Sequence, residues 1–199
     1  MLIAISGVII LGIVAGYFTN PSFLIHNLNF LSTFCLAVLL LGVGIDLGSN
    51  GQVIDKLKQL GWRVLLIPLL IAVGSILGTA GVGMVLDLSL NESSAIGAGF
   101  GWYSLSGVIL TKIYSADLGV LAFLTNVFRE VFAIILIPLL AQWNNEIIVV
   151  APGGATTMDT TLPLISESVA KKEVVAIAFI SGAVLSSLVP ILVPILIKI

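Results

Sequence analysis

The chain of 199 residues is 59 % hydrophobic and only 9 % charged, with a formal net charge of −2 and a mean hydropathy of +1.23. Soluble domains carry about 25 % charged residues, so this composition excludes a water-covered domain and predicts an all-α integral membrane protein. There is one cysteine, Cys35, no basic run, and no HExxH, GxSxG, P-loop or CxxC motif, so we expect no enzyme, no metal, no cofactor and no nucleic-acid partner.

Seven apolar stretches have, or nearly have, the roughly 17 to 25 residues that a membrane-spanning helix needs. They cover residues 2–18, 28–47, 61–86, 94–113, 117–142, 147–165 and 173–198. Five of these stretches read as ordinary apolar helices. The fourth and the sixth contain glycine and hydroxyl residues, around 99–107 and 151–163, and are predicted to be broken or re-entrant. The sequence thus predicts six to seven transmembrane segments in the lipid bilayer.

The basic residues predict the orientation of the spans, because lysine and arginine are enriched in cytoplasmic loops. If all seven stretches cross, the basic loops fall on one side. These loops hold Lys56, Lys58, Arg63, Lys112, Lys171 and Lys172. This arrangement predicts a multi-pass protein of the cytoplasmic (inner) membrane, with its N-terminus inside and its C-terminus outside; only Lys198 offends the rule. Re-entrant hairpins are the alternative, but they would leave Lys112 outside, so full crossings are preferred.

The two broken stretches are candidates for a binding site. Free backbone N–H and C=O groups in hydrocarbon cost several kcal/mol each, so such segments survive only against protein or a wet cavity. Paired interruptions in corresponding positions indicate the binding site of a transporter, where half-helix ends face the substrate. Close helix packing through small residues is the alternative. A polar loop and a long apolar helix follow each broken stretch, which suggests an internal repeat.

Ionisable residues inside the apolar stretches also point to a site. A charge at the centre of a membrane helix costs about 2.5–3.5 kcal/mol, so it faces the bundle interior and has a partner. Asp159 lies in the sixth stretch beside helix-breaking residues. Asn126, Arg129 and Glu130 share one face of the fifth stretch through their i, i+3, i+4 spacing. Arg129 is expected to pair with Asp159, with a substrate carboxylate, or in a structural ion pair, which leaves Glu130 for a cation.

Four motifs of the chain together resemble the LysO-type lysine exporter family. They are GFGWYSLSGVILTK (99–112), NVFREVFAIILIP (126–138), GGATTMDTTLP (153–163) and LSSLVPIL (185–192). The resemblance implies an inner-membrane exporter of L-lysine and close analogues, with Asp159 as an intramembrane acid needed for export. The expected substrate and proton-coupling residues are Asp159, Glu130, Arg129 and Asn126. The expected lining residues are Trp102, Tyr103, Ser104, Ser106, Gly153, Gly154, Thr156, Thr157 and Thr160.

This chain departs from the family pattern at its N-terminus. Full-length members carry further spans before the region that begins here. We expect residues 1–199 to form a single transmembrane transporter domain. That domain either works alone or pairs with a small membrane subunit or with a second copy in a homodimer.

The predicted function is secondary active export of L-lysine by proton antiport. A membrane potential negative inside opposes cation export by about 2.3 kcal/mol per charge per 100 mV, and exchange of one proton for one lysine cancels that cost. The exchange needs a carboxylate, Asp159 or Glu130, that holds either a proton or the substrate. The alternatives are a non-transporting subunit that needs a partner, an exporter of another cationic amino acid, and a channel.

Overall fold

The computed structural model describes residues 61–143 and 146–199, together with scattered positions between residues 11 and 59. The predicted spans 2–18 and 28–47 lie almost wholly outside the described residues, as do Cys35 and the location of the N-terminus. Within 61–143 and 146–199 every regular element is a helix and no strand occurs, which confirms the all-α class predicted from composition.

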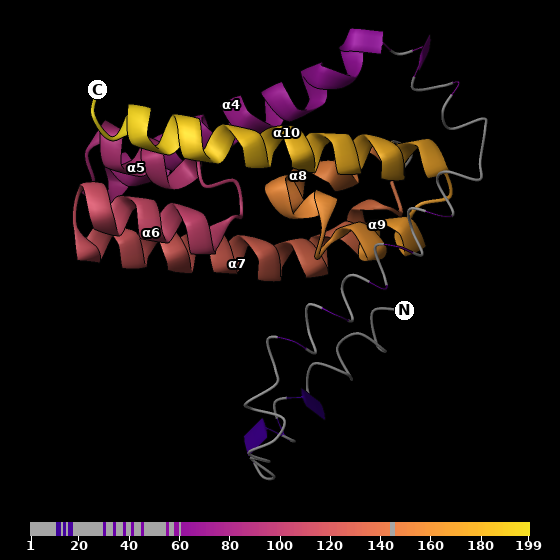
Figure 1. The fold of residues 1–199 in the computed structure, drawn as a ribbon, viewed down its shortest axis with the longest axis horizontal. Coiled ribbons are helices and arrows are strands. Elements are labelled where there is room, and N and C mark those ends of the chain that lie inside the picture. Colours follow the sequence, from indigo (N-terminus) through magenta and orange to yellow (C-terminus); the bar gives the residue numbers. More distant parts are fainter. Residues whose placement is uncertain are drawn as a thin grey trace.

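Within the part of the chain that the structure describes, three helices are long and apolar enough to cross a membrane. They are α4 (Leu66–Val85, preceded by the 3-10 turn η1, Gly61–Leu65), α7 (Ala116–Leu140) and α10 (Lys172–Leu196). At 1.5 Å per residue, a helix of 25 residues reaches about 38 Å, which exceeds the hydrocarbon core. α4 and α10 run in one direction and α7 runs in the other (Figure 1). These helices confirm the predicted spans 61–86, 117–142 and 173–198 to within two residues.

The fourth predicted stretch forms a helical hairpin, α5 (Leu90–Gly97) and α6 (Tyr103–Ile113). A capping box starts α5, in which Ser89 and Glu92 satisfy each other's backbone N–H groups. The hairpin turns at residues 98–102, here called the first tip. Its two outer ends are joined, because the Tyr114 hydroxyl donates a hydrogen bond to Glu92 Oε1 over 2.8 Å. Both ends of the stretch therefore lie at the end of the bundle where α7 begins.

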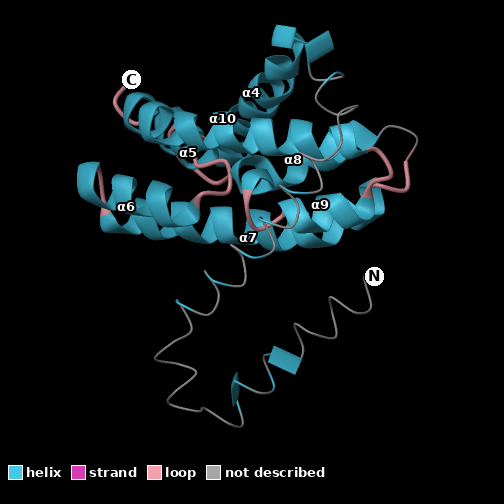
Figure 2. Ribbon diagram, turned by 45° about the vertical axis from the view of Figure 1, so that its right-hand side comes forward, coloured by secondary structure: helices cyan, strands magenta, loops and turns pink. Residues whose placement is uncertain are grey.

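The sixth predicted stretch forms a second hairpin from the other end of the bundle. It consists of η2 (Glu146–Val149), α8 (Val150–Gly153), η3 (Gly154–Met158) and α9 (Leu162–Ser168). Residues 154–161 turn the chain and are here called the second tip. The Lys171 backbone N–H donates to Glu146 Oε2 over 3.0 Å, so the outer ends of this hairpin are also joined. α8 lies between α7 and α10 in both views (Figures 1 and 2).

These two joined ends correct the preference for full crossings. The charge rule favoured crossings because they place Lys112 beside Lys171 and Lys172, but the hairpins put Lys112 at the opposite end of α7. The physical reason is that a hairpin leaves its broken backbone at mid-depth. There the backbone groups of one tip meet protein partners instead of hydrocarbon.

The two hairpins belong to an inverted duplication. α7 spans Ala116–Leu140 and α10 spans Lys172–Leu196, so both have 25 residues and the second begins 56 positions after the first. The first hairpin begins at Leu90 and the second at Glu146, again 56 positions apart. The same offset aligns identical residues: Ala95 with Ala151, Gly97 with Gly153, Ala122 with Ala178, Phe123 with Phe179 and Pro138 with Pro194. The internal repeat that the sequence suggested is therefore present in the architecture.

The buried apolar side chains form two clusters, one around each hairpin. One cluster joins α5 and α6 to the C-terminal half of α10, with Phe100, Leu110 and Leu185 at its centre. The other joins α8 and α9 to the N-terminal half of α10 and the C-terminal half of α7, around Ile137 and Ile165. Each hairpin is therefore held by its own core, and α10 connects the two.

Candidate functional site

The two tips touch each other near the middle of the bundle. The Ala155 backbone N–H donates to the carbonyl oxygen of Phe100 over 2.8 Å. Glycines permit this approach, because Gly101 (φ +99°) and Gly154 (φ +62°) both have left-handed backbones that other residues rarely adopt. A Cβ at Gly154 would overlap the carbonyl oxygen of Phe100. A backbone hydrogen bond thus joins the two broken segments and gives a polar group of each segment a partner.

Asn126 on α7 holds the first tip. Its Oδ1 accepts a hydrogen bond from the Gly101 N–H at 2.7 Å, and its Nδ2 donates to the carbonyl oxygen of Ile96 at 3.3 Å. The same amide nitrogen lies 2.9 Å from the carbonyl oxygen of Ala122, one turn earlier on α7. The side chain is 3 % exposed, so it replaces the hydrogen bonds that the broken helix lost.

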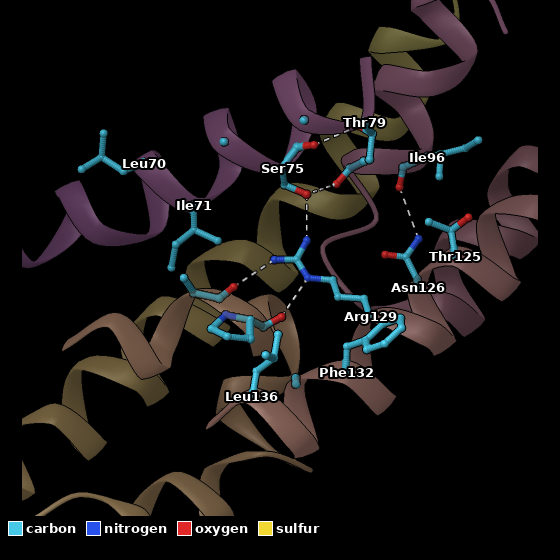
Figure 3. Close-up of a pocket in the computed structure, with 16 residues that line it drawn as sticks. Leu70, Ile71, Ser75, Thr79, Ile96, Thr125, Asn126, Arg129, Phe132 and Leu136 are labelled. Carbon is cyan, nitrogen blue, oxygen red and sulfur yellow. Dashed lines mark hydrogen bonds between the residues drawn. The ribbon is translucent and has the colours of Figure 1, made fainter. Parts of the chain in front are cut away.

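Arg129, one turn further along α7, holds the second hairpin (Figure 3). Its Nε donates to the carbonyl oxygen of Pro152 at 3.0 Å and its Nη2 to that of Ala151 at 3.2 Å, while Nη1 reaches Ser75 Oγ at 2.7 Å. These carbonyls belong to α8, whose C-terminal end carries negative partial charge that suits a cation. The fork of the guanidinium thereby ties α8 to α4.

A cavity of about 190 Å³ opens beside the tips, and we call it the tip cavity. Its lining residues are Gly101, Trp102, Tyr103, Ser104, Glu130, Ala155, Thr156, Met158, Asp159, Thr160 and Ser186. Two carboxylates, Glu130 and Asp159, therefore share one small space with five hydroxyl groups. Asp159 Oδ1 accepts a hydrogen bond from the Thr160 N–H at 2.6 Å. This arrangement offers negative charge to a cation and hydroxyls to either sign of charge.

Seven of the residues expected from the sequence meet in the tip cavity. They are Asp159, Glu130, Trp102, Tyr103, Ser104, Thr156 and Thr160. Asn126 and Arg129 lie outside it on the tip backbones, and Arg129 forms no salt bridge with any described residue, Asp159 included. Arg129 and Glu130 therefore line different cavities although they are neighbours in sequence. The reason is that consecutive residues are about 100° apart around a helix.

The remaining expected residues support the tips from outside the cavity. Ser106 Oγ donates to the carbonyl oxygen of Trp102 at 2.9 Å. Thr157 Oγ1 lies 2.8 Å from the carbonyl oxygens of both Gly154 and Ala178, which connects the second tip to α10. Gly153 is buried against the side chains of three threonines of the second tip, Thr156, Thr157 and Thr161. These positions build the site without lining it.

Sequence reasoning missed four lining residues: Gly101, Ala155, Met158 and Ser186. Ser186 lies in the apolar helix α10, where one serine gives no signal by itself. The signal that finds it is the 56-residue offset, which aligns Ser186 with Glu130.

A second, larger cavity lies on the other side of α7, and we call it the α4–α7 groove (Figure 3). It has a volume of about 720 Å³ and is mostly apolar, with Ser75, Asn126 and Arg129 as its principal polar residues. On α4 it is lined by Gly74 and Gly78, which have open space where a Cβ would stand. Its chemistry suits apolar chains rather than a hydrophilic solute.

Comparison with known proteins gives consistent matches. Residues 6–197 match the family described as Lysine exporter LysO. The chain is 36 % identical over 189 residues to Lysine exporter LysO of Escherichia coli (strain K12), covering 94 % of this chain and 61 % of that protein. It is 33 % identical over 184 residues to a putative lysine exporter of Haemophilus influenzae (strain ATCC 51907 / DSM 11121 / KW20 / Rd), covering 92 % of each. No solved structure matches the chain.

Proposed function

Because the chain belongs to the lysine exporter LysO family, we propose that it carries the export path for L-lysine and close cationic analogues. The observation that carries the proposal is the tip cavity, where two broken segments bring Glu130 and Asp159 into one space. The cavity lies at the meeting point of two inverted hairpins, which is where secondary transporters bind substrate. The chain spans about three fifths (61 %) of the length of the E. coli relative.

The chemistry of the cavity fits a cationic amino acid. Lysine carries two ammonium groups and one carboxylate, and the cavity holds two carboxylates and the hydroxyls of Tyr103, Ser104, Thr156, Thr160 and Ser186. A bound ammonium group gains charge-assisted hydrogen bonds with Glu130 or Asp159. These two acids line the same small cavity and no basic side chain is among its lining residues, which favours occupation by either a substrate cation or a proton.

Proton antiport follows from the same pair of acids. Export of one lysine cation against an inside-negative potential costs about 2.3 kcal/mol per 100 mV, and return of one proton cancels that cost. Asp159, on the second tip, takes the proton when the substrate leaves. Glu130, on the continuous helix α7, keeps the cavity attractive to cations in both states.

The basic residues orient the molecule in the cytoplasmic membrane. Arg63, Lys171 and Lys172 lie at the end of the bundle where α4 and α10 begin, and this end faces the cytoplasm. The second hairpin then enters from the cytoplasm and the first from outside, with the C-terminus outside. Lys112 and Lys198 are the basic residues of the described chain at the outer end.

Lysine counterflow in proteoliposomes tests the proposal, measured with and without an imposed pH gradient. We expect uptake of labelled lysine by the wild type, driven uphill by the gradient, and loss of the gradient-driven part in Asp159→Asn. Glu167→Gln is the matched control, because Glu167 is an exposed acid of the same hairpin that does not line the cavity. Gradient-driven transport by Asp159→Asn at the wild-type rate would contradict the mechanism.

A subunit that needs a partner is the competing function, and the open α4–α7 groove is the observation that favours it. An apolar groove of this size can receive a helix of another chain or of a second copy. Reconstitution of the chain alone decides between the two: lysine counterflow without any partner rejects the competing function. Counterflow only after co-reconstitution with a small membrane subunit supports it.

A further inference from the structure

Ser186 is a buried polar group that the folded chain leaves unused. Its side chain is 6 % exposed, and its Oγ forms no hydrogen bond with any described residue. A buried hydroxyl without a partner costs about 1–3 kcal/mol, so such groups call for an explanation. Ser186 is also one of the residues that line the tip cavity, so its unpaired hydroxyl lies at the wall of the space where the proposed substrate binds.

The inverted duplication gives Ser186 a defined place in the site. The 56-residue offset pairs it with Glu130, and both line the tip cavity. The same offset pairs Trp102 with Met158, Tyr103 with Asp159 and Ser104 with Thr160, all of which also line it. The cavity therefore lies on the pseudo-two-fold axis, with the acid Glu130 on one side and the neutral donor Ser186 on the other. The two repeats therefore contribute different chemistry to the cavity, a carboxylate from α7 and a neutral hydroxyl from α10.

A second donor set faces the cavity from the start of α6. Tyr103 and Ser104 are its first two residues and both line the cavity. The backbone N–H groups of Ser104 and Leu105 have no acceptor among the described residues. The free N–H groups at a helix N-terminus carry positive partial charge and bind anions. α6 has 11 residues, so its dipole is developed over three turns.

We propose that Ser186 Oγ–H and the N-terminus of α6 together bind the carboxylate of the transported amino acid. The assignment rests on the proposed function and deepens it. The ammonium groups of the same molecule bind Glu130 and Asp159, which line the same cavity. The site therefore recognises a zwitterionic head and a second cation, and it selects lysine over cadaverine, the diamine that lacks the carboxylate.

Two other serines of α10 supply matched controls. Ser187, next in sequence, is exposed and donates to the carbonyl oxygen of Ala183 at 2.9 Å. Ser181 has a buried Oγ without a hydrogen bond among the described residues, as Ser186 does, but it does not line the cavity. Alanine at either position removes a hydroxyl from the same helix without touching the proposed carboxylate site.

The experiment is competition in proteoliposome counterflow of labelled lysine, with unlabelled lysine or cadaverine as competitor. In Ser186→Ala we expect the apparent affinity for lysine to fall about tenfold, as for loss of a hydrogen bond to a charged group. We expect the affinity for cadaverine to stay unchanged, so the preference for lysine narrows. Ser186→Thr, which keeps the hydroxyl, restores most of the preference, and Ser181→Ala and Ser187→Ala keep it.

The thermal unfolding of each detergent-purified variant separates binding from folding. Equal loss of lysine and cadaverine affinity in a folded Ser186→Ala variant overturns the assignment, as does an unchanged affinity for lysine. Absence of lysine counterflow from the wild type, alone and with a partner subunit, overturns the proposed function itself and the assignment with it. Wild-type counterflow combined with an unchanged preference in Ser186→Ala overturns the assignment alone.

Discussion

At the scale of single residues, two polar side chains on one helix hold both breaks of the fold. Asn126 binds the backbone of the first tip and Arg129 binds the carbonyls of α8, one helical turn apart on α7. The next residue, Glu130, lines the tip cavity instead. One short stretch of α7 therefore supplies both the support of the site and one of its charges.

Replacing Asn126 by alanine removes partners from Gly101 N–H and the Ile96 carbonyl in a buried place. We expect the free energy of unfolding to fall by about 1–3 kcal/mol, the cost of buried groups without hydrogen bonds. Thermal unfolding in detergent measures the change, with Thr125→Ala, the preceding residue on α7, as the control. Equal melting temperatures for the Asn126 and Thr125 variants would show that the tip does not depend on this amide.

Arg129→Lys tests whether Arg129 positions the hairpin or contacts substrate. Lysine keeps the charge but lacks the planar fork that reaches Ala151, Pro152 and Ser75 together. We expect the maximal rate of lysine counterflow to fall about tenfold while KM stays the same, because the side chain lies outside the tip cavity. A rise in KM with an unchanged maximal rate would instead place Arg129 on the substrate.

Gly154→Ala should disrupt the contact between the tips. Its backbone has φ +62°, which costs a residue with a Cβ about 1–2 kcal/mol, and the new Cβ would overlap the Phe100 carbonyl oxygen. We expect lower thermal stability and loss of counterflow. Gly78→Ala is the control, since a Cβ there meets nothing within 4 Å. A fully active Gly154→Ala protein would mean that lysine transport does not depend on the contact between the two tips.

At the scale of elements, each hairpin is closed at its outer ends by a carboxylate. Glu92 accepts from the Ser89 N–H and from the Tyr114 hydroxyl, and Glu146 accepts from the Lys171 N–H. These bonds tie the two outer ends of each hairpin to each other. The same units are related by the inverted duplication, so exchange of their conformations would open the tip cavity to one side and then to the other.

The closure of the first hairpin should depend on pH. The hydrogen bond from the Ser89 backbone, with smaller contributions from the Ser89 and Tyr114 hydroxyls, lowers the pKa of Glu92 below its usual 4.5. The stabilisation of the first hairpin by ionised Glu92 is therefore present above about pH 4.5, and it is lost as the pH falls through the lowered pKa of Glu92. The bond to Glu92 also raises the pKa of Tyr114 above 10.0, so that contribution persists until the pH rises through the raised value.

Hydrogen exchange of α5 amides against pH measures this dependence. We expect the protection of α5 amides to decrease in acid for the wild type. In Glu92→Gln we expect this protection to change less with pH. Ser89→Ala should lower helix stability by about 0.5–2 kcal/mol at neutral pH, the usual cost of a lost N-cap. An acid limb of equal size in Glu92→Gln would assign the effect to another group.

At the scale of the whole molecule, the described residues form three long apolar helices, α4, α7 and α10, and two hairpins that enter the bundle from opposite ends. This topology places Lys112 and Lys171 at opposite ends of α7, whereas full crossings would place them on the same side. The difference therefore decides from which end of the bundle each hairpin enters.

Cysteine labelling measures the topology directly. The sequence has one cysteine, so Cys35→Ser supplies a background without thiols. In intact cells we expect a membrane-impermeant thiol reagent to label a cysteine at position 112 but not one at position 171, and to label both after lysis. Labelling of neither position, or of both, in intact cells would contradict the two-hairpin arrangement.

Much of the fold was predictable from composition and spacing. The apolar runs predicted α4 together with η1, α7 and α10 to within two residues, because a bilayer demands a fixed length of continuous apolar helix. The broken stretches and the acids Glu130 and Asp159 were also visible, because polar residues in such a setting have few alternatives. The charge rule placed Lys112 on the wrong side. The first hairpin enters and leaves the bundle at the same end, so Lys112 lies at the end opposite Lys171.

By itself the sequence determined the membrane class, the three spans, the two interruptions and seven residues of the candidate site. These follow from local chemistry, since hydropathy, glycine and buried charge each act through the nearest few residues. Only the tertiary structure decided that the interrupted segments turn back, that their tips bond through Ala155 and Phe100, and that Ser186 and Glu130 line the same cavity. Those outcomes depend on which distant backbone group satisfies another inside the bundle, and no single segment carries that information.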